Sequence, residues 1–414
     1  MSISVLKFGG TSVKNIARIG HVAGIIEADP ADKKVVVLSA MGDTTDYLLR
    51  LAKQCSAVPD KRELDLLLAS GEQVSISLLA IKLKERGINA RAYTGQQLRI
   101  CTDSSHTEAR ILDIDKEALL AKLDECDVLI AAGFQGIDEK GEVTTLGRGG
   151  SDTSAVAIAA CVGAPVCEIF TDVDGIYTAD PNKVKSASLR EETSYEEATQ
   201  LAYAGAQVIH PRAVELAEQY EIQINVRNTF KPECPGTKIV KEEKMERVSD
   251  SYSVAISQKE ACLKIKGADK SFDLIGRLST LADSHDLTIY SVSEYIEEDD
   301  SNNCNRLCLE AYIGYKDIDR LKNAVAELKE ESGAASSTID VDLAKLSIIG
   351  RALSRETLNK LVRTLKEAGV SPRKIEFSDT KISCLIDSLK GAFASNLVHD
   401  SLNAGLIKSK VSVA

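Results

Sequence analysis

Short, almost uninterrupted apolar runs that end in glycine or a polar turn recur along the first half of the chain, and they constrain the fold more than any other feature. Five such runs occur, at Ser2–Phe8, Lys34–Ser39, Asp127–Ala132, Ala164–Phe170 and Ile222–Val226. Amphipathic helical stretches, such as Leu64–Arg86 and Ser151–Val162, separate them. Strands apolar on both faces that alternate with helices are typical of a mostly parallel sheet covered on both sides, an α/β/α domain of three layers. Ligands of such folds bind beyond the carboxyl ends of the strands, where the glycine-rich turns fall.

The second half of the chain has a different organisation. It begins after the charged segment Lys241–Arg247, which is typical of an exposed linker. The order strand, helix, strand, strand, helix then occurs twice, over Cys262–Glu331 and over Lys345–Ala404. This internal repeat indicates two ferredoxin-like units, each so small that we expect it to stack on its twin or on a second chain. We therefore predict three domains, residues 1–245, 251–341 and 342–414.

Composition excludes several classes of protein. The net charge of -11 gives no general attraction to nucleic acid or to an anionic membrane, so an anionic ligand must meet a local positive site. The ten cysteines and five histidines are scattered without the spacing of a metal site, which favours reduced thiols in a cytoplasmic protein. Met1–Lys7 already resembles a strand rather than a signal peptide, and no apolar run approaches the ~20 residues that span a bilayer.

The first candidate for chemistry is the turn Lys7-Phe8-Gly9-Gly10, which a buried strand delivers into a helix start. Glycines let backbone N–H groups approach an anion closely, and a lysine beside them is a point charge suited to phosphate. An ordinary β-to-α turn with an exposed lysine explains this segment equally well.

The second candidate is the turn around Arg148, where an arginine, Gly147, Gly149, Gly150 and Asp152 converge at a helix start. An arginine can hold a carboxylate in a bidentate fork. A capping or helix-dipole role would explain Asp152 alone, but it leaves the arginine among glycines unexplained.

Two further segments carry polar groups after predicted strands. Thr171–Pro181 is rich in carboxylates and contains Tyr177, although turn propensity explains much of it. Ser39–Thr45, with Ala69–Gln73 downstream, offers hydroxyls and the carboxylate of Glu72 for an amino-acid ligand. Helix capping, with Glu72 as a solvated acid in a first turn, is the simpler explanation of that spacing.

Other nucleotide-binding motifs are missing from the sequence. It contains no Gly-x-x-x-x-Gly-Lys-Ser/Thr segment, and no Gly-x-Gly-x-x-Gly follows a strand. These absences weigh against a P-loop enzyme and a dinucleotide oxidoreductase.

Taken together, the polar segments resemble those of the aspartate kinases of the amino-acid kinase superfamily. The resemblance rests on six segments in the same order, Lys7–Ser12, Ser39–Asp46, Ala69–Glu72, Gly133–Gly136, Thr145–Thr153 and Thr171–Pro181. The two repeated units resemble the paired ACT domains of the monofunctional members, most clearly at Lys345–Gly350 and Asp379–Asp387. The resemblance covers essentially the whole chain and leaves no room for a homoserine dehydrogenase domain.

The resemblance implies an activity, a set of site residues and partners. The activity is ATP-dependent phosphorylation of the β-carboxylate of L-aspartate, the first step of lysine, threonine and methionine biosynthesis. The implied catalytic residues are Lys7 and Asp152, with Asp152 positioning the lysine. The implied aspartate-binding residues are Ser39, Thr45, Glu72, Arg148, Gly149, Gly150 and Ser151. The implied ATP-binding residues are Lys7, Phe8, Gly9, Gly10, Thr171, Asp172, Tyr177, Asp180 and Pro181. Mg²⁺ would be carried by ATP, lysine or threonine would bind the ACT domains as effector, and the chain would form a homodimer or larger assembly.

The chemistry agrees with these parts. The β-carboxylate of aspartate has a pKa near ~3.9, so it is ionised at neutral pH and needs no general base. Phosphoryl transfer needs in-line positioning and cations near the transferred group, which Lys7 and magnesium can supply.

The sequence also departs from the family pattern. Gln207 stands where a nucleotide-associated lysine is usual, and Asn182 stands where a basic residue is common. Leu287–Glu294 and Gly350–Arg355 lack the usual ACT signatures, so the effector stays open. Met245, just before the repeated units, could serve as an internal start, although coincidence explains its position. The alternatives to an aspartate kinase are another carboxylate or carbamate kinase of the superfamily and an amino-acid sensor without catalysis.

Overall fold

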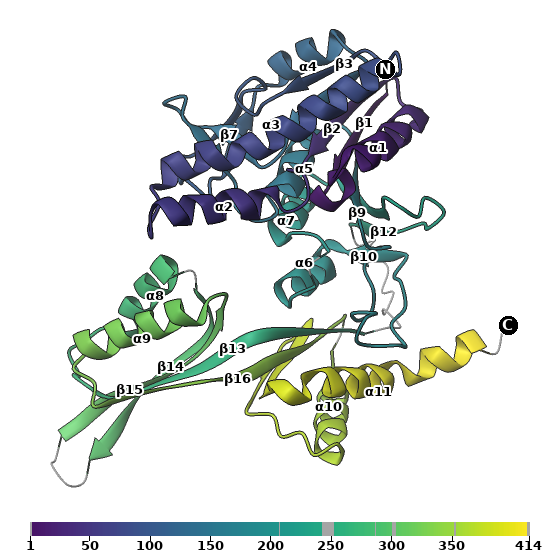
Figure 1. Ribbon diagram of the computed structural model, residues 1–414. Helices are drawn as coiled ribbons and strands as arrows, with labels where there is room; N and C mark the ends of the chain where they lie inside the picture. The colour runs from purple at the N-terminus through teal and green to yellow at the C-terminus, as the bar shows by residue number, and fades with distance from the viewer. Residues whose placement is uncertain are drawn as a thin grey trace. The chain divides into compact units, whose positions relative to one another are not determined.

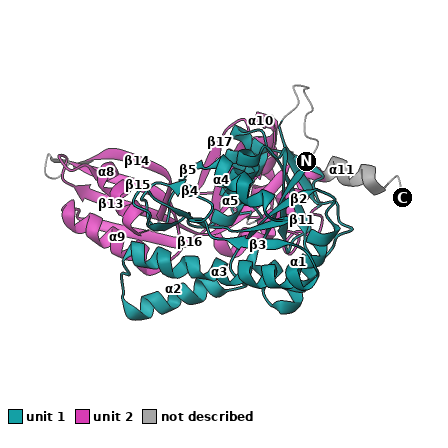
Figure 2. Ribbon diagram, turned by 90° about the horizontal axis from the view of Figure 1, so that it is seen from above, with its two compact units in different colours: residues 1–178, 188–247 teal, residues 179–187, 248–414 magenta. Residues whose placement is uncertain are grey.

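The chain folds into two compact units, of residues 1–178 with 188–247 and of residues 179–187 with 248–414 (Figure 2). The computed structural model describes residues 2–206, 208–241, 252–285, 287–299, 304–351 and 353–411, without the side chains of 298, 299, 304, 305 and 404–411. Gln207, Met245 and the predicted linker beyond Lys241 lie outside these residues. The division into domains 1–245, 251–341 and 342–414 stays a prediction.

Unit 1 is built on a sheet of eight strands in the order β10-β12-β11-β9-β1-β2-β6-β3 (Figure 1). The strands are β1 (Ile3–Phe8), β2 (Lys33–Leu38), β3 (Ala90–Tyr93), β6 (Val128–Ala132), β9 (Val166–Thr171), β10 (Glu192–Ser194), β11 (Gln223–Asn228) and β12 (Thr237–Val240). All neighbouring pairs are parallel except β11 with β12. The predicted mostly parallel sheet is therefore confirmed, and its glycine-rich turns follow β1, β2 and β6 at one edge.

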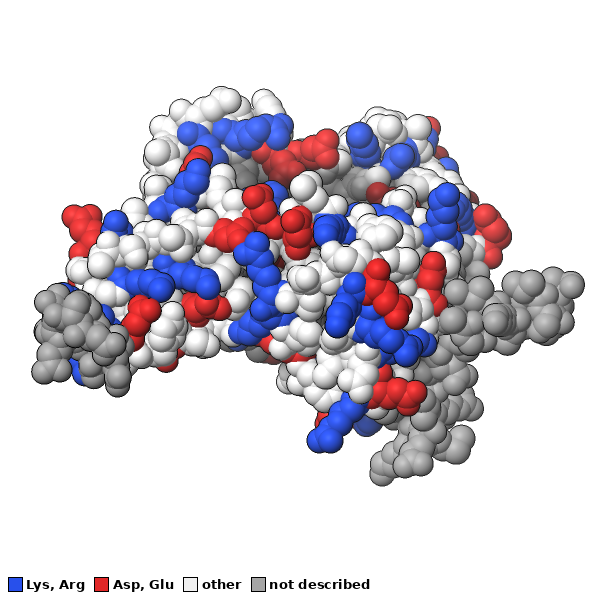
Figure 3. Space-filling model, turned by 90° about the horizontal axis from the view of Figure 1, so that it is seen from below, with Lys and Arg blue, Asp and Glu red and all other residues white. Residues whose placement is uncertain are grey.

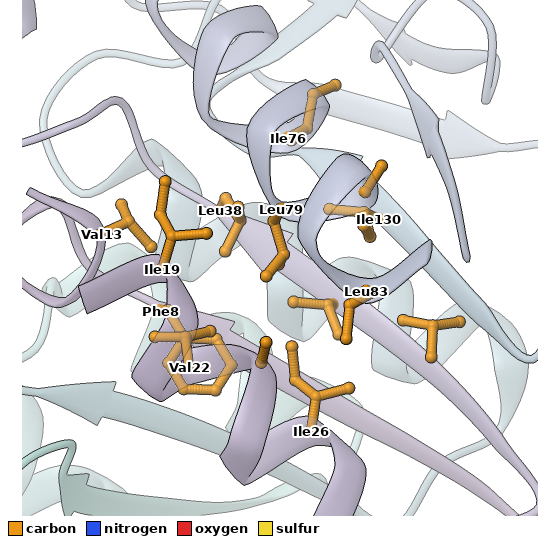
Figure 4. Close-up of a cluster of buried hydrophobic side chains, with 14 of the residues drawn as sticks. Phe8, Val13, Ile19, Val22, Ile26, Leu38, Ile76, Leu79, Leu83 and Ile130 are labelled. Atoms are coloured by element: carbon orange, nitrogen blue, oxygen red, sulfur yellow. The ribbon is translucent and has the colours of Figure 1, made fainter. Parts of the chain in front are cut away.

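Helices cover both faces of this sheet. They are α1 (Ile16–Ala28), α2 (Thr44–Cys55), α3 (Lys61–Glu85), α4 (Lys116–Asp124), α5 (Gly150–Val162), α6 (Tyr195–Tyr203) and α7 (Pro211–Gln219), with a short 3-10 turn η1 (Gly10–Val13). Side chains of α1 and α3 pack on β1, β2 and β6 in one core cluster, in which Leu79 and Leu83 meet Ile19, Val22 and Ile26 (Figure 4). The helix α5 lies against β1, β2 and β9. A smaller sheet in the order β5-β4-β7-β8 consists of β4 (Ile100–Thr102), β5 (Ile111–Ile114), β7 (Gln135–Ile137) and β8 (Val143–Thr145).

The long helix α3 corrects one expectation. By length and composition it could cross a membrane, contrary to the expectation that no apolar run approaches that length. Half of its most apolar 18-residue window is buried inside the protein, where Ile76 and Leu79 belong to the core. Packing on the sheet accounts for its composition, as for other core helices of this length.

Unit 2 contains one six-stranded sheet in the order β14-β15-β13-β16-β18-β17. Its strands are β13 (Ser253–Ala268), β14 (Leu287–Asp299), β15 (Cys304–Tyr315), β16 (Ser336–Ile349), β17 (Lys374–Phe377) and β18 (Lys381–Asp387). Its helices are α8 (Leu274–His285), α9 (Ile318–Glu331), α10 (Arg355–Glu367) and α11 (Gly391–Val411), with a short 3-10 turn η2 (Ser388–Lys390). The two predicted ferredoxin-like units are confirmed, and two separate cores lie under α8–α9 and under α10–α11.

The strands β13 and β16 run through both of these units and are much longer than the predicted Cys262–Lys266 and Lys345–Ile349. Their antiparallel register shifts around Glu260, next to Lys259, which has a φ of +64°. Such bulges re-aim the side chains, so one pair of strands can serve two cores.

Residues 179–187 pack with unit 2 rather than with the strands that flank them in sequence. Ala179 forms a β-bridge with Val254, and the Ser186 hydroxyl lies 3.0 Å from Nδ1 of His399. Acidic and basic side chains lie intermingled on the face shown in Figure 3.

The core of unit 1 predicts how two leucines of α3 differ. Leu79→Ala removes a fully buried side chain, and we expect it to lower the free energy of unfolding by about 2–5 kcal/mol. Leu66→Ala, at a position that is 52% exposed on the same helix, should change it by less than about 0.5 kcal/mol. Urea denaturation followed by circular dichroism measures both, and equal effects of the two substitutions would contradict this view of the core.

Candidate active site

An ion pair between Lys7 and Asp152 lies at the centre of unit 1. Leu6 and Phe8 point into the core under α1 and α3, so the alternation of β1 directs Lys7 to the opposite face, which α5 covers. Asp152 lies in the first turn of α5, and its Oδ1 is 2.5 Å from Nζ of Lys7. Each side chain is only about a tenth exposed, so the pair is strongly shielded from water. Gly149 is the N-cap of α5, so Asp152 is not the capping residue, although it does lie in the first turn, where an acid interacts favourably with the helix dipole.

The turns that follow β1, β2 and β9 touch one another. A Cβ on Gly10 would lie 2.8 Å from the carbonyl oxygen of Ala40, and the Gly42 N–H donates to the Gly10 carbonyl at 3.0 Å. The Gly9 N–H donates to the carbonyl of Phe170 at the end of β9. Only glycine allows this close approach of two backbones at position 10.

Phe8 contributes little to this edge beyond its backbone. Its side chain is fully buried and stacks on Phe170, with ring centroids 4.7 Å apart. Its carbonyl accepts the N–H of Ser39 at 3.2 Å. A nucleotide contact from Phe8 would therefore have to come from backbone atoms.

Glu72 is a buried carboxylate with one oxygen that is unused. It lies in the interior of α3 at 2% exposure, so its interpretation as a solvated first-turn acid is wrong. Its Oε1 accepts the N–H of Ala40 at 2.9 Å, whereas Oε2 has no hydrogen-bond partner among the described residues. Burial raises the pKa of Glu72 to about 8. Ser39 and Thr45 are both half-buried. Ser39 lies in the turn after β2, and Thr45 lies in the first turn of α2.

The loop from β8 to α5 carries Arg148, whose side chain is exposed and forms no ion pair within the described part of the chain. Gly147 and Gly149 flank it with φ angles of +76° and +67°. A Cβ on Gly150 would lie 2.9 Å from the Phe134 ring, and a Cβ on Gly133 would lie 2.8 Å from Ser151. Of the predicted group, Gly150 and Ser151 thus pack against the turn after β6, whereas Gly149 packs against His210.

The turn after β9 contains a network that sequence reasoning missed. Asp174 accepts hydrogen bonds from Lys231 Nζ at 2.9 Å and from the Tyr177 hydroxyl at 3.2 Å, and Asn228 also donates to it. The buried Thr229 hydroxyl lies 2.7 Å from that of Ser12, next to Gly10. The segment Asn228–Lys231 had a single signal in the sequence, which was its place after the predicted strand Ile222–Val226.

Thr171 and Asp172 lie at the same edge, and the Thr171 hydroxyl is 3.3 Å from Oδ1 of the exposed Asp172. Asp180 and Pro181 belong to unit 2 instead, where Asp180 pairs with Lys183 at 3.1 Å. The assignment of Asp180 and Pro181 to a nucleotide stays a prediction.

The carboxyl ends of β1, β2 and β9 therefore bring a shielded lysine and hydroxyl groups to one edge of the sheet. The helix α3 adds a carboxylate oxygen that has no hydrogen-bond partner among the described residues. The loop that carries Arg148 is connected to this edge through Ser151, which contacts Gly133 in the turn after β6. Such a set can bind an anion beside a small molecule that carries both an ammonium and a carboxylate group.

Comparison with known proteins extends this picture. Residues 2–228 match the model of the amino acid kinase family. Among curated relatives, the aspartokinase of Geobacillus stearothermophilus is 38% identical over 417 residues, and the alignment covers 100% of both chains. Aspartokinase 2 of Bacillus subtilis is 36% identical over 97% of this chain and 98% of its own length.

Solved structures agree on the fold. The aspartate kinase of Synechocystis matches with a TM-score of 0.53 and 34% identity, over 98% of this chain and 69% of its own. Aspartokinase III of Escherichia coli, in complex with aspartate and ADP, matches with a TM-score of 0.77 and 23% identity, over 97% of this chain and 99% of its own. Because the match to the curated relatives runs along the whole length, the chain belongs to the aspartokinases of the amino acid kinase family.

Proposed function

We propose that the chain transfers the γ-phosphoryl group of ATP to the β-carboxylate of L-aspartate and so produces 4-phospho-L-aspartate. The observation that carries this proposal is the shielded Lys7–Asp152 pair at an edge that also holds the unsatisfied Oε2 of Glu72. The ammonium group of Lys7 suits the phosphoryl group that is transferred, and the carboxylate of Glu72 suits the ammonium group of an amino acid. Full-length similarity to curated aspartokinases supports the choice of aspartate.

Lys7 would supply positive charge to the phosphoryl group as it moves. Negative charge spreads over the phosphoryl oxygens in the transition state, and a fixed cation in a water-poor site stabilises it there. Asp152 would hold the lysine ammonium in place through their 2.5 Å contact. The substrate carboxylate attacks as it stands, since it is ionised at neutral pH.

Aspartate would be bound at both of its ends. Arg148 would hold the α-carboxylate, with Gly149, Gly150 and Ser151 shaping the pocket around it. Glu72 would accept the α-ammonium through Oε2, and Ser39 and Thr45 would border the same pocket.

ATP would lie along the turns after β1 and β9. Gly9 and Gly10 would face its phosphates, and Thr171, Asp172 and Tyr177 would surround the nucleotide, with Asp180 and Pro181 in addition. Magnesium would arrive with ATP as part of the substrate. Lys231, bound to Asp174, adds a cation at this edge.

Regulation would reside in the two ferredoxin-like units of residues 251–341 and 342–414. Aspartokinase III of Escherichia coli has been solved in complex with lysine and aspartate in its T-state. By analogy, we expect lysine or threonine to bind these units. We also expect a homodimer or larger assembly to form through them, and the protein to act in the cytoplasm.

Trapping with hydroxylamine tests the reaction. With ATP, magnesium and a panel of amino acids, the full chain should form a hydroxamate with aspartate alone, because only an acyl phosphate reacts in this way. Hydroxamate with another carboxylate, and none with aspartate, would assign the chain to a different carboxylate kinase. Repeating the assay with lysine or threonine would identify the effector.

Two substitutions should separate catalysis from substrate binding. Lys7→Ala should lower kcat by about 10²–10³-fold, because it removes a fixed charge from the transition state. Arg148→Ala should raise the KM for aspartate by about 10- to 100-fold, the effect of losing a charged hydrogen-bond pair. Steady-state kinetics measures both, with Lys140→Ala on an exposed turn as control. A wild-type kcat in the Lys7 variant would rule out its assigned role.

The raised pKa of Glu72 predicts a pH dependence of aspartate binding. Only the ionised carboxylate can accept the substrate ammonium, and with a pKa of about 8 the free enzyme holds Glu72 protonated at lower pH. The KM for aspartate should therefore rise as the pH falls below 8, by up to about tenfold per pH unit. Glu72→Gln should raise the KM and make it nearly independent of pH between 6 and 8. A wild-type KM that is flat over this range would contradict the proposed role of Glu72.

A further inference from the structure

The substrate loop Leu146–Gly149 must be held by its backbone. Arg148 has no ion-pair partner among the described residues, so its side chain gives the loop no anchor. Gly147 and Gly149 adopt left-handed φ angles, which glycine reaches without strain but also leaves easily. Groups outside the loop therefore have to fix the direction in which Arg148 is presented.

Arg212 in the first turn of α7 is one such group. Its Nη1 donates to the carbonyl of Leu146 at 2.7 Å, and its Nη2 donates to the carbonyl of Ala109 at 3.0 Å. The Ala109 N–H in turn donates to the carbonyl of Thr145 at 2.9 Å. One guanidinium group thus ties the start of the substrate loop to the segment before β5.

The geometry of Arg212 fits this task. No carboxylate within the described ranges pairs with it, and its guanidinium donates to two carbonyl oxygens, those of Leu146 and Ala109. Two parallel N–H groups can hold two acceptors at fixed separation, which a lysine ammonium cannot reproduce.

His210, two residues earlier, holds the other end of the loop. It is the N-cap residue of α7, and its ring packs directly on Gly149. A Cβ on Gly149 would lie 2.1 Å from Cγ of His210, so the contact leaves no space for a side chain. The segment His210–Arg212 thus contacts the loop on both sides of Arg148.

We propose that Arg212 is a positioning residue for aspartate, which acts by holding the Leu146–Gly149 loop so that Arg148 meets the substrate carboxylate. This inference rests on the proposed function. Removal of the guanidinium frees the Leu146 carbonyl, loosens the loop and weakens aspartate binding, while Lys7, Asp152 and the ATP edge stay in place.

A neighbouring arginine gives a matched control. Arg110 and Arg212 line the same cavity of about 430 Å³, together with Thr153, Tyr203 and Glu215. Unlike Arg212, Arg110 is exposed and its side chain makes no hydrogen bond to the substrate loop among the described residues. Arg110→Ala removes the same charge from the same cavity without touching the loop.

The test is steady-state kinetics of the full chain with aspartate and ATP varied separately. Arg212→Ala should raise the KM for aspartate by about 10- to 100-fold, as expected for a lost hydrogen bond from a charged group. The KM for ATP and kcat should change by less than about threefold, and Arg110→Ala should behave as wild type. Arg212→Lys should recover only part of the affinity, because one ammonium cannot replace the fork.

Chemical rescue separates positioning from general stability. Ethylguanidinium at millimolar concentration can enter the cavity and should lower the KM for aspartate of Arg212→Ala, but not of wild type or Arg110→Ala. An unchanged KM for aspartate, or equal rises in both KM values without rescue, would overturn the proposal. If Arg212→Ala does not fold, Arg212→Lys decides alone, and an aspartate KM equal to that of wild type overturns it. A wild-type chain that forms no aspartyl hydroxamate would instead remove the proposed function itself.

Discussion

The burial of Lys7 against Asp152 is the constraint on which the catalytic unit depends. Taking two charges out of water is unfavourable, and a buried pair seldom stabilises a fold more than apolar side chains of the same size would. Removal of either partner would leave an uncompensated charge between β1 and α5. The pair therefore makes sense as a fixed charge for chemistry, which the rest of the sheet has to support through well-packed apolar neighbours such as Leu6 and Phe8.

A parallel sheet is the means by which distant segments reach that pair. The carboxyl ends of its strands meet at one edge, so the turns after β1, β2, β6 and β9 become neighbours although β1 and β9 are far apart in sequence. Backbone contacts then lock these turns together, as Gly10 does against Ala40 and Gly9 does against Phe170. Local glycine content and global topology agree at this edge, which is why the sequence alone could predict that these turns meet there.

The sequence predicted those parts of the fold and site that have a local signal. Apolar strands, glycine turns and the Lys7 and Arg148 segments were all visible. Contacts between residues that only tertiary packing brings together left no such signal in the sequence. Neither the contact of Glu72 with the Ala40 N–H nor the contact of Arg212 with the Leu146 carbonyl follows from spacing. The strands β13 and β16 were predicted too short because the register shift near Glu260 interrupts their alternation, and the sharing of one strand by two cores leaves no local mark.

Two buried carboxylates of unit 1, Asp152 and Glu72, differ in whether a cation of the protein compensates their charge. Asp152 has a lysine at 2.5 Å, so its charge is compensated within the protein. Glu72 is more deeply buried, yet among the described residues only the Ala40 N–H donates to one of its oxygens, and burial raises its pKa to about 8. A chain gains nothing in stability from such a group, because an apolar residue would fill the same space without desolvating a charge. Under the proposed function the compensating cation comes from the substrate, because an amino acid carries an ammonium group.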